Sequence, residues 1–161
     1  MQMNPKKTEE GFSYHLKTKM PNELQKTDMS IKQALVVEDN AAVCKFITIA
    51  LKSIGFEVQT AENGQVAYDL FLKNRCDLVI TDLQMPVMNG LALIRKLKNK
   101  APDTPIILIS GEFPGDISEN GCHTAIAGFL HKPFSLSELH RAALNAVSRA
   151  RSRVAPSTPH L

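Results

Sequence analysis

Residues 78–86 of this chain read LVITDLQMP, and the fold follows from this stretch. Three large apolar residues lead towards a carboxylate at Asp82, and Pro86 follows a short distance later. An apolar run of this length, bounded by turn residues, predicts a strand that is buried on both faces, as in a parallel sheet. Asp82 would then lie at the carboxyl end of the strand, where open α/β sheets place their ligand sites.

Similar strands recur along the chain. Short apolar runs lie at residues 34–37, 106–109 and 129–131, and an alternating stretch at 56–60 is typical of an edge strand. Apolar residues at helical spacing lie between these runs. Strands that alternate with helices in this way predict an α/β fold, a doubly wound, five-stranded parallel sheet of order 2-1-3-4-5 with helices on both faces.

Four helices with an apolar face are predicted. The first ends at Gly55, the second begins after Asn63, the third spans 90–100, and the last begins at a capping box of Ser135 and Glu138. The residues expected to face the core are Val43, Phe46, Ile47, Ala50, Leu51, Ile54, Val66, Ala67, Leu70, Phe71, Leu93, Ile94, Leu97, Leu136, Leu139, Ala143, Val147 and Ala150.

Two segments are less regular. The cations of the third helix are expected to form its solvent-facing side, namely Arg95, Lys96, Lys98 and Lys100. Prolines and glycines interrupt residues 112–127, where a further helix is expected, so that helix is predicted to be short or to begin late.

Length and composition indicate one domain with polar ends. Residues 1–31 are predicted to be a disordered N-terminal extension, 32–154 the folded domain, and 155–161 a flexible tail. The chain has three widely spaced cysteines and no CxxC, which argues against a disulfide framework or a zinc site. It has neither a signal peptide nor an apolar run of the roughly 18 residues that a membrane span requires. A soluble protein of the cytoplasm is therefore expected.

The basic charge lies at the ends of the chain. The net charge is +3, and residues 141–161 carry four arginines and no acid. The favoured interpretation of these arginines is that they lie on the solvated end of the last helix. The alternative is that Arg149, Arg151 and Arg153 contact nucleic acid, which is the less favoured of the two.

Polar residues follow the apolar strands at their carboxyl ends. Glu38 and Asp39 follow the first strand and Asp82 ends the third, and these strands are neighbours in the predicted sheet. Like charges at ~4 Å cost roughly 4 kcal/mol at an effective dielectric near 20, so the cluster needs a cation. Hard oxygen ligands suit Mg²⁺. With a cation from Lys132 and a hydroxyl from Ser110, such a pocket suits a phosphoryl group, with Asp82 as its nucleophile.

Five landmarks in order resemble the receiver domain of two-component response regulators, which has a flavodoxin-like fold. They cover residues 33–150 and are VVED at 36–39, DLQMP at 82–86 with Asn89-Gly90, ISG at 109–111, Phe129, and KPF at 132–134. The resemblance implies that Asp82 accepts a phosphoryl group from a sensor histidine kinase or a histidine phosphotransfer protein. It implies no enzyme beyond self-phosphorylation and self-dephosphorylation.

The resemblance also implies the metal ligands. Asp39, Asp82 and the backbone carbonyl of Gln84 would bind Mg²⁺, and Glu38 would act through water. Glu38 stands where aspartate is commoner in the family, so its extra methylene bears on the geometry of the metal.

The remaining landmarks imply a switch. Lys132 would pair with the acyl phosphate, Ser110 would hydrogen-bond it and move, and Phe129 would turn inward. Phe129 lacks the hydroxyl of the tyrosine often found there. The Lys132–Pro133 bond would be cis, as in the family.

The same residues bear on three other classes of protein. A hydrolase of the haloacid dehalogenase type needs a second acid two residues after its nucleophile, and Gln84 stands there. A nucleotide or flavin binder needs a Gly-rich or Ser/Thr-rich first loop, but residues 38–40 are acidic. A receiver-like interaction module that is seldom phosphorylated stays open as an alternative.

The output is expected to be protein binding. Only seven residues follow Val154, too few for an output domain, which predicts a single-domain regulator of the chemotaxis type or a phosphorelay intermediate. Phosphorylation would shift a pre-existing equilibrium, and a downstream protein would bind the face formed by residues 112–150.

Overall fold

The computed structural model describes residues 32–112 and 124–154. The predicted N-terminal extension, the predicted tail at 155–161 and residues 113–123 of the interrupted helical segment lie outside the described residues.

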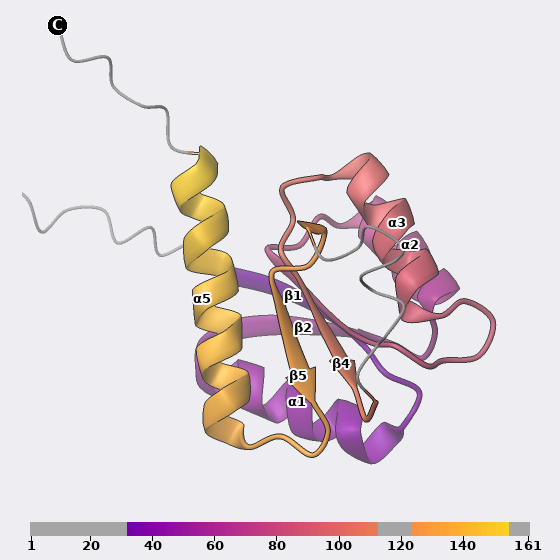
Figure 1. Cartoon of the computed structure of the whole chain (residues 1–161), viewed down its shortest axis with the longest axis vertical. Coiled ribbons are helices and arrows are strands. Elements are labelled where there is room, and N and C mark those ends of the chain that lie inside the picture. The colour runs from indigo at the N-terminus through magenta and orange to yellow at the C-terminus, as the bar shows by residue number, and fades with distance from the viewer. Residues whose placement is uncertain (1–31, 113–123, 155–161) are drawn as a thin grey trace, which may run out of the picture.

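A single five-stranded sheet forms the centre of the molecule (Figure 1). Its strands are β1 (Lys32–Val37), β2 (Phe56–Ala61), β3 (Leu78–Asp82), β4 (Ile106–Ser110) and β5 (Gly128–His131). All neighbouring strands are parallel, and the order is β2-β1-β3-β4-β5. The predicted fold class and strand order are therefore confirmed, with β2 at the edge.

Helices cover both faces of the sheet. They are α1 (Ala41–Ser53), α2 (Gly64–Lys73), α3 (Gly90–Lys100) and α5 (Leu136–Val154). Figure 1 shows α5 on one side of the sheet and α2 and α3 on the other. The apolar side chains form two clusters, one beneath α1 and α5 and the other beneath α2 and α3.

The strand β3 contributes to both clusters. Leu78 and Ile80 join the cluster beneath α1 and α5, and Val79 joins the cluster beneath α2 and α3. Since side chains alternate along a strand, a strand between two cores must be apolar at consecutive positions. This explains why all residues of β3 and β4 are buried.

Three residues predicted to face the core are exposed. Phe46 is 41% exposed, Val66 38% and Leu136 47%. Leu136 lies in the first turn of α5, beside the edge where the strands end, so little apolar surface remains to cover it. Helical periodicity identifies an apolar stripe but not where the sheet beneath it stops.

Lys98 was wrongly predicted to face solvent. It is half-buried, and its Nζ donates hydrogen bonds to the carbonyls of Pro102 at 2.8 Å and Thr104 at 2.7 Å. The chain turns back beneath α3 after Lys100 and brings these carbonyls to the lysine. Arg95, Lys96 and Lys100 are exposed, as predicted.

Among the described residues, no helix combines the length and the apolar character needed to cross a bilayer.

Candidate functional site

The site lies at the carboxyl edge of the sheet. Asp82 is the last residue of β3, Ser110 is the last residue of β4, and Glu38 and Lys132 directly follow β1 and β5. Parallel strands end at the same edge, so side chains that are far apart in the sequence meet there. The structure brings together the predicted residues Glu38, Asp82 and Lys132.

Lys132 bridges two buried carboxylates. Its Nζ lies 2.7 Å from Glu38 Oε2 and 3.0 Å from Asp82 Oδ1. The side chain of Glu38 is 1% exposed, that of Asp82 10%, and that of Lys132 26%. The lysine therefore holds a fixed positive charge between the two acids, at a point that solvent still reaches.

The electrostatics of this group favour an additional cation. Burial raises the pKa of Glu38, and the charge of Asp82 acts in the same direction, against the hydrogen bonds from Lys132 and Asn40. Burial lowers the pKa of Lys132, but its hydrogen bonds to the two carboxylates and their charges outweigh burial and leave that pKa raised. Lys132 is therefore positively charged. Its single charge does not fully offset the effect of burial on the pKa of Glu38.

A third carboxylate completes an acidic cluster. One oxygen from each of Glu38, Asp39 and Asp82 lies within 4.8 Å of the others. Asp39 is exposed, whereas the other two are buried. Three hard oxygen donors with one open side are a set that suits Mg²⁺, which keeps several of its own waters. The residues present therefore fit the metal that the sequence predicted.

Local hydrogen bonds place Glu38 at the start of α1. Its backbone N–H donates to the carbonyl of Ala61 at 3.0 Å, which ties it to the end of β2. The backbone N–H of Asn40 donates to Glu38 Oε1 at 3.1 Å, and the Asn40 side chain caps α1 by accepting from Ala42 and Val43. Sequence reasoning missed this role of Asn40, although an asparagine just before a helical stripe is a capping signal.

The loop between β3 and α3 is held from two sides. The N–H of Gly90 donates to the carbonyl of Leu83 at 2.9 Å, and the N–H of Gly64 donates to the carbonyl of Met88 at 3.1 Å. A Cβ at Gly64 would lie 2.6 Å from that carbonyl oxygen, so only glycine fits. Sequence reasoning missed Gly64, because its need for glycine arises from a contact with a distant loop.

The same loop contains a tight turn. Val87 has a φ of +67°, and the N–H of Met88 donates to the carbonyl of Pro86 at 2.8 Å. This is a γ-turn of the strained kind, centred on a residue that is 83% exposed. The turn lies close after Asp82.

The remaining predicted site residues lie on β4, on β5 and in the loops that follow β3 and β5. Ser110 is buried, and its Oγ accepts a hydrogen bond from the N–H of Glu112 at 3.1 Å. Phe129 is half-buried and packs against the cluster beneath α2 and α3. The side chain of Gln84 reaches Glu112 at 3.5 Å. The Lys132–Pro133 peptide bond is cis.

The fold and this arrangement of side chains define a receiver-type module. The response regulator receiver domain family matches residues 34–144, and the chain belongs to this family. Receiver domains are signalling modules of two-component systems that accept phosphoryl groups from histidine kinases.

Particular relatives agree with this assignment. The chain is 33% identical over 129 residues to the response regulator MprA of a Mycobacterium species (strain KMS), covering 79% of this chain and 55% of that protein. It is 34% identical over 105 residues to the autoinducer 1 sensor kinase/phosphatase LuxN of Vibrio campbellii, covering 65% of this chain and 12% of LuxN. This chain thus spans about half, or much less, of the length of these relatives.

Solved structures show the same fold. The chemotaxis protein CheY4 of Vibrio cholerae superposes with a TM-score of 0.68 at 27% identity, covering 73% of this chain and 99% of that one. A receiver domain protein from Clostridium thermocellum superposes with a TM-score of 0.68 at 28% identity, covering 76% and 99%.

Proposed function

We propose that this protein is phosphorylated on Asp82, with Mg²⁺ bound by the neighbouring carboxylates, and signals by binding another protein. The observation that carries the proposal is the contact between Lys132 Nζ and Asp82 Oδ1 at 3.0 Å, inside a cluster of three carboxylates. A nucleophile, a fixed cation and a set of metal ligands at one edge are the parts that phosphoryl transfer requires.

The proposed reaction transfers a phosphoryl group from phosphohistidine. A carboxylate oxygen of Asp82 forms a bond to phosphorus while the P–N bond breaks, and the imidazole leaves with its electron pair. Lys132 then faces the new acyl phosphate and balances its negative charge. Asp39, Asp82 and the backbone carbonyl of Gln84 would hold Mg²⁺, with Glu38 acting through water, and bound Mg²⁺ neutralises charge on the transferred oxygens.

Intact mass spectrometry tests the phosphorylation site. The protein is incubated with acetyl phosphate and Mg²⁺, and we expect the mass gain of one phosphoryl group. Asp82→Asn should abolish the gain, and Asp69→Asn, which removes an exposed carboxylate of α2, should leave it intact. A gain that survives in Asp82→Asn, or that is missing in the wild type, contradicts the proposal and favours a module that is not phosphorylated.

The proposed switch uses Ser110 and Phe129. Ser110 Oγ lies at the end of β4, next to β3, where it accepts from the Glu112 N–H, and its own O–H can donate to a phosphate on Asp82. Ser110→Ala should still be phosphorylated by acetyl phosphate but should lose the NMR shifts that phosphorylation produces in residues 124–131. Unchanged shifts in Ser110→Ala would assign the switch to other residues.

An apolar groove beside the site suits the docking of a helix from the protein that donates the phosphoryl group. The groove has a volume of about 520 Å³ and is lined by Ala42, Val43, Phe46, Lys132, Pro133 and Phe134. The ring of Phe46 is 41% exposed and lies 6.1 Å from that of Phe134. We propose that a helix of the histidine kinase or phosphotransfer protein packs here, with its phosphohistidine facing Asp82.

Two donors separate docking from chemistry. Phe46→Ser should slow transfer from a phosphorylated histidine kinase, screened from a panel for one that phosphorylates the wild type. The same variant should react normally with acetyl phosphate, which needs no docking. Leu72→Ser, which removes an apolar side chain of α2 with 54% exposure, is the matched control. If Phe46→Ser slows phosphorylation equally with both donors, Phe46 acts on the chemistry at the site and not on docking of the kinase.

The downstream partner is proposed to bind within residues 112–150, of which 112 and 124–150 belong to the described part of the chain. A pull-down with phosphorylated protein against the Asp82→Asn variant tests this. A partner retained equally by both forms would contradict a phosphorylation-dependent readout.

A further inference from the structure

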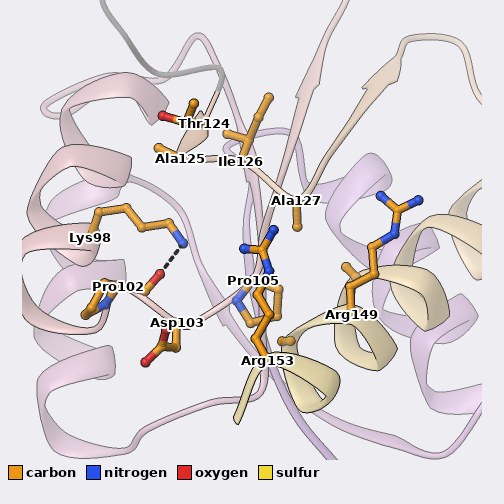
Figure 2. Close-up of a pocket in the computed structure, with 12 residues that line it drawn as sticks. Lys98, Pro102, Asp103, Pro105, Thr124, Ala125, Ile126, Ala127, Arg149 and Arg153 are labelled. Carbon is orange, nitrogen blue, oxygen red and sulfur yellow. Dashed lines mark hydrogen bonds between the residues drawn. The ribbon is translucent and has the colours of Figure 1, made fainter. Parts of the chain in front are cut away.

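We propose that this protein has a second anion site, at the amino edge of the sheet, which binds the phosphate group of a small phosphate ester. The site is a cleft between the end of α3 and the last turns of α5 (Figure 2). Its cationic groups come from Lys98, Arg149 and Arg153.

The cleft is separate from the phosphorylation site. Pro105 and Ala127 line it, and these residues directly precede β4 and β5, whereas Ser110 and Lys132 lie at the other ends of these strands. Five strand residues at about 3.3 Å each place the two sites roughly 15 Å apart. A ligand in the cleft therefore touches neither Asp82 nor Lys132.

Positive charge dominates the cleft. The three cations face one carboxylate, Asp103, among the lining residues. Figure 2 shows the head groups of Lys98 and Arg153 extending into the cleft from its two walls, and the carboxylate of Asp103 turned away from both. Arg149 and Arg153 are four residues apart on α5, a spacing that places them on one side of a helix. In Figure 2 the head group of Arg149 extends away from Lys98, so an anion in the cleft would lie between Lys98 and Arg153 and offset the repulsion between them.

Lys98 is held in position for such a ligand. Its Nζ donates to the carbonyls of Pro102 and Thr104, and Figure 2 shows the first of these bonds. An ammonium has three N–H donors, and within the described residues these two carbonyls are its acceptors, so one donor remains. Burial lowers the pKa of Lys98, the charge of Asp103 opposes this, and the charge of Arg153 adds a smaller lowering, so Lys98 lies within range of both charges.

The size of the cleft decides what kind of anion it takes. Its volume is about 120 Å³. A water molecule occupies about 30 Å³, so the cleft has room for roughly four waters. Pockets for whole drug-sized molecules begin at about 300 Å³. The cleft therefore fits one tetrahedral oxyanion with the rest of the ligand outside, and arginine forks match phosphate oxygens in pairs.

A simpler role for these cations is to balance helix dipoles. Cations in the last turn of a helix are favourable because its carbonyl end is negative. Lys98, however, donates to Pro102 and Thr104, which lie beyond the end of α3, and not to the carbonyls of the helix. Arg149 lies before the last turn of α5. Lys98 and Arg153 lie in the last turns of α3 and α5, so dipole compensation contributes to their placement, but it explains neither the bonds of Lys98 beyond its helix nor the position of Arg149.

NMR titration of the ¹⁵N-labelled full chain tests the proposal. The probes are inorganic phosphate and glucose 6-phosphate at pH 7.5, with EDTA, and with chloride replaced to hold ionic strength constant. We expect saturable shifts in residues 98–105, 124–127 and 146–153, of equal size in the wild type and in Asp82→Asn. Arg153→Gln should weaken binding about tenfold, as the loss of a charged hydrogen bond predicts, and Arg149→Gln, whose head group extends away from Lys98, should weaken it less.

Control variants remove the same charge from the same helices. Arg95→Gln on α3 and Arg141→Gln on α5 are both exposed and lie outside the cleft, and they should bind phosphate like the wild type. Because Lys98→Gln can destabilise the fold through its lost carbonyl bonds, the two arginine variants carry the test.

Four outcomes would overturn the proposal. One is shifts that chloride reproduces at the same ionic strength, and another is binding that survives in Arg153→Gln and Arg149→Gln. The third is binding of a DNA duplex through these arginines without any response to either phosphate probe, which would make this edge a nucleic-acid surface. Loss of the shifts in Asp82→Asn alone would place the anion at the phosphorylation site. Because the expected binding is independent of Asp82, failure here leaves the proposed function intact.

Discussion

The Cα of Gly90 lies against the backbone carbonyl of Asp82, with no space for a side chain between them. The first residue of α3 thereby touches the end of β3, and the N–H of Gly90 donates to the carbonyl of Leu83 at 2.9 Å. The position of the Asp82 carboxylate thus depends on a glycine that has no side chain.

Gly90→Ala should destabilise the protein. The new Cβ collides with backbone, which cannot rotate away, and overpacking of this kind costs about 1–3 kcal/mol. Urea unfolding should show this loss, together with slower phosphorylation by acetyl phosphate. Gly111→Ala is the control, because a Cβ at Gly111 has nothing within 4 Å and its backbone needs no positive φ. A Gly90→Ala protein as stable as the wild type would mean that α3 can shift away from β3 at no cost.

The strands and their terminal carboxylates were predictable from the sequence, for a physical reason. A strand between two cores is apolar at consecutive positions, so its first charged residue marks the edge of the sheet, as Asp82 does. Glu38 and Lys132 were found by the same rule. Their convergence followed from the strand order, which the alternation of strands and helices restricts strongly.

What the sequence did not reveal depends on contacts between distant segments. Gly64 requires glycine because Met88 approaches it, and Lys98 is half-buried because the chain returns to it after α3. Phe46 has the spacing of a core residue, yet it lies where α1 meets Phe134 at the surface. Periodicity reports the side of a helix on which a residue lies and not what lies opposite it.

Glu38→Gln should stabilise the metal-free protein at pH 7. Burial raises the pKa of Glu38 above its ordinary value of 4.5, so the folded state binds this proton more tightly than the unfolded state. The stability gained from a protonated Glu38 is present below pH 4.5 and is lost as the pH rises through the folded pKa. In urea unfolding with EDTA between pH 4 and 8, the free energy of unfolding of the variant should exceed that of the wild type at pH 7 and equal it at pH 4. The opposite order at pH 7 would mean that the Lys132 contact outweighs burial.

Mg²⁺ should stabilise the wild-type protein. A ligand that binds only the folded state adds about 2.7 kcal/mol at a concentration one hundred times its Kd. Asp39→Asn should leave the metal-free stability within about 0.5 kcal/mol, because Asp39 is exposed, and should remove most of the gain from Mg²⁺. Asp69→Asn should keep that gain. A Mg²⁺ response that is equal in all three proteins would place the metal elsewhere.

The capping box of α5 should depend on pH. Ser135 Oγ and the Ser135 N–H each lie 2.7 Å from Glu138 Oε2, and these bonds lower the pKa of Glu138 below 4.5. A lowered carboxyl pKa gives stability that is present above the unfolded pKa and is lost as the pH falls through the folded pKa. Ser135→Ala should cost about 1 kcal/mol at pH 7 and less in acid. An NMR titration should show the pKa of Glu138 rising only part of the way towards 4.5 in Ser135→Ala, because the backbone N–H of residue 135, the larger cause, remains; an unchanged pKa would assign the whole shift to that N–H.

Val87→Gly should stabilise the protein, although it shortens a side chain. The φ of Val87 is +67°, and a side chain in this region costs roughly 1–2 kcal/mol, whereas glycine adopts it freely. Because Val87 is 83% exposed, little packing is lost. Glycine's greater freedom in the unfolded chain destabilises the folded state by about 0.5–1 kcal/mol. The net increase in the free energy of unfolding is therefore about 0.5–1 kcal/mol. Val87→Ala keeps a Cβ and should gain little, so the difference between the two variants in urea unfolding measures the strain of the turn. If glycine and alanine have the same effect, the turn after Asp82 stores no strain that a phosphorylation-dependent change could release.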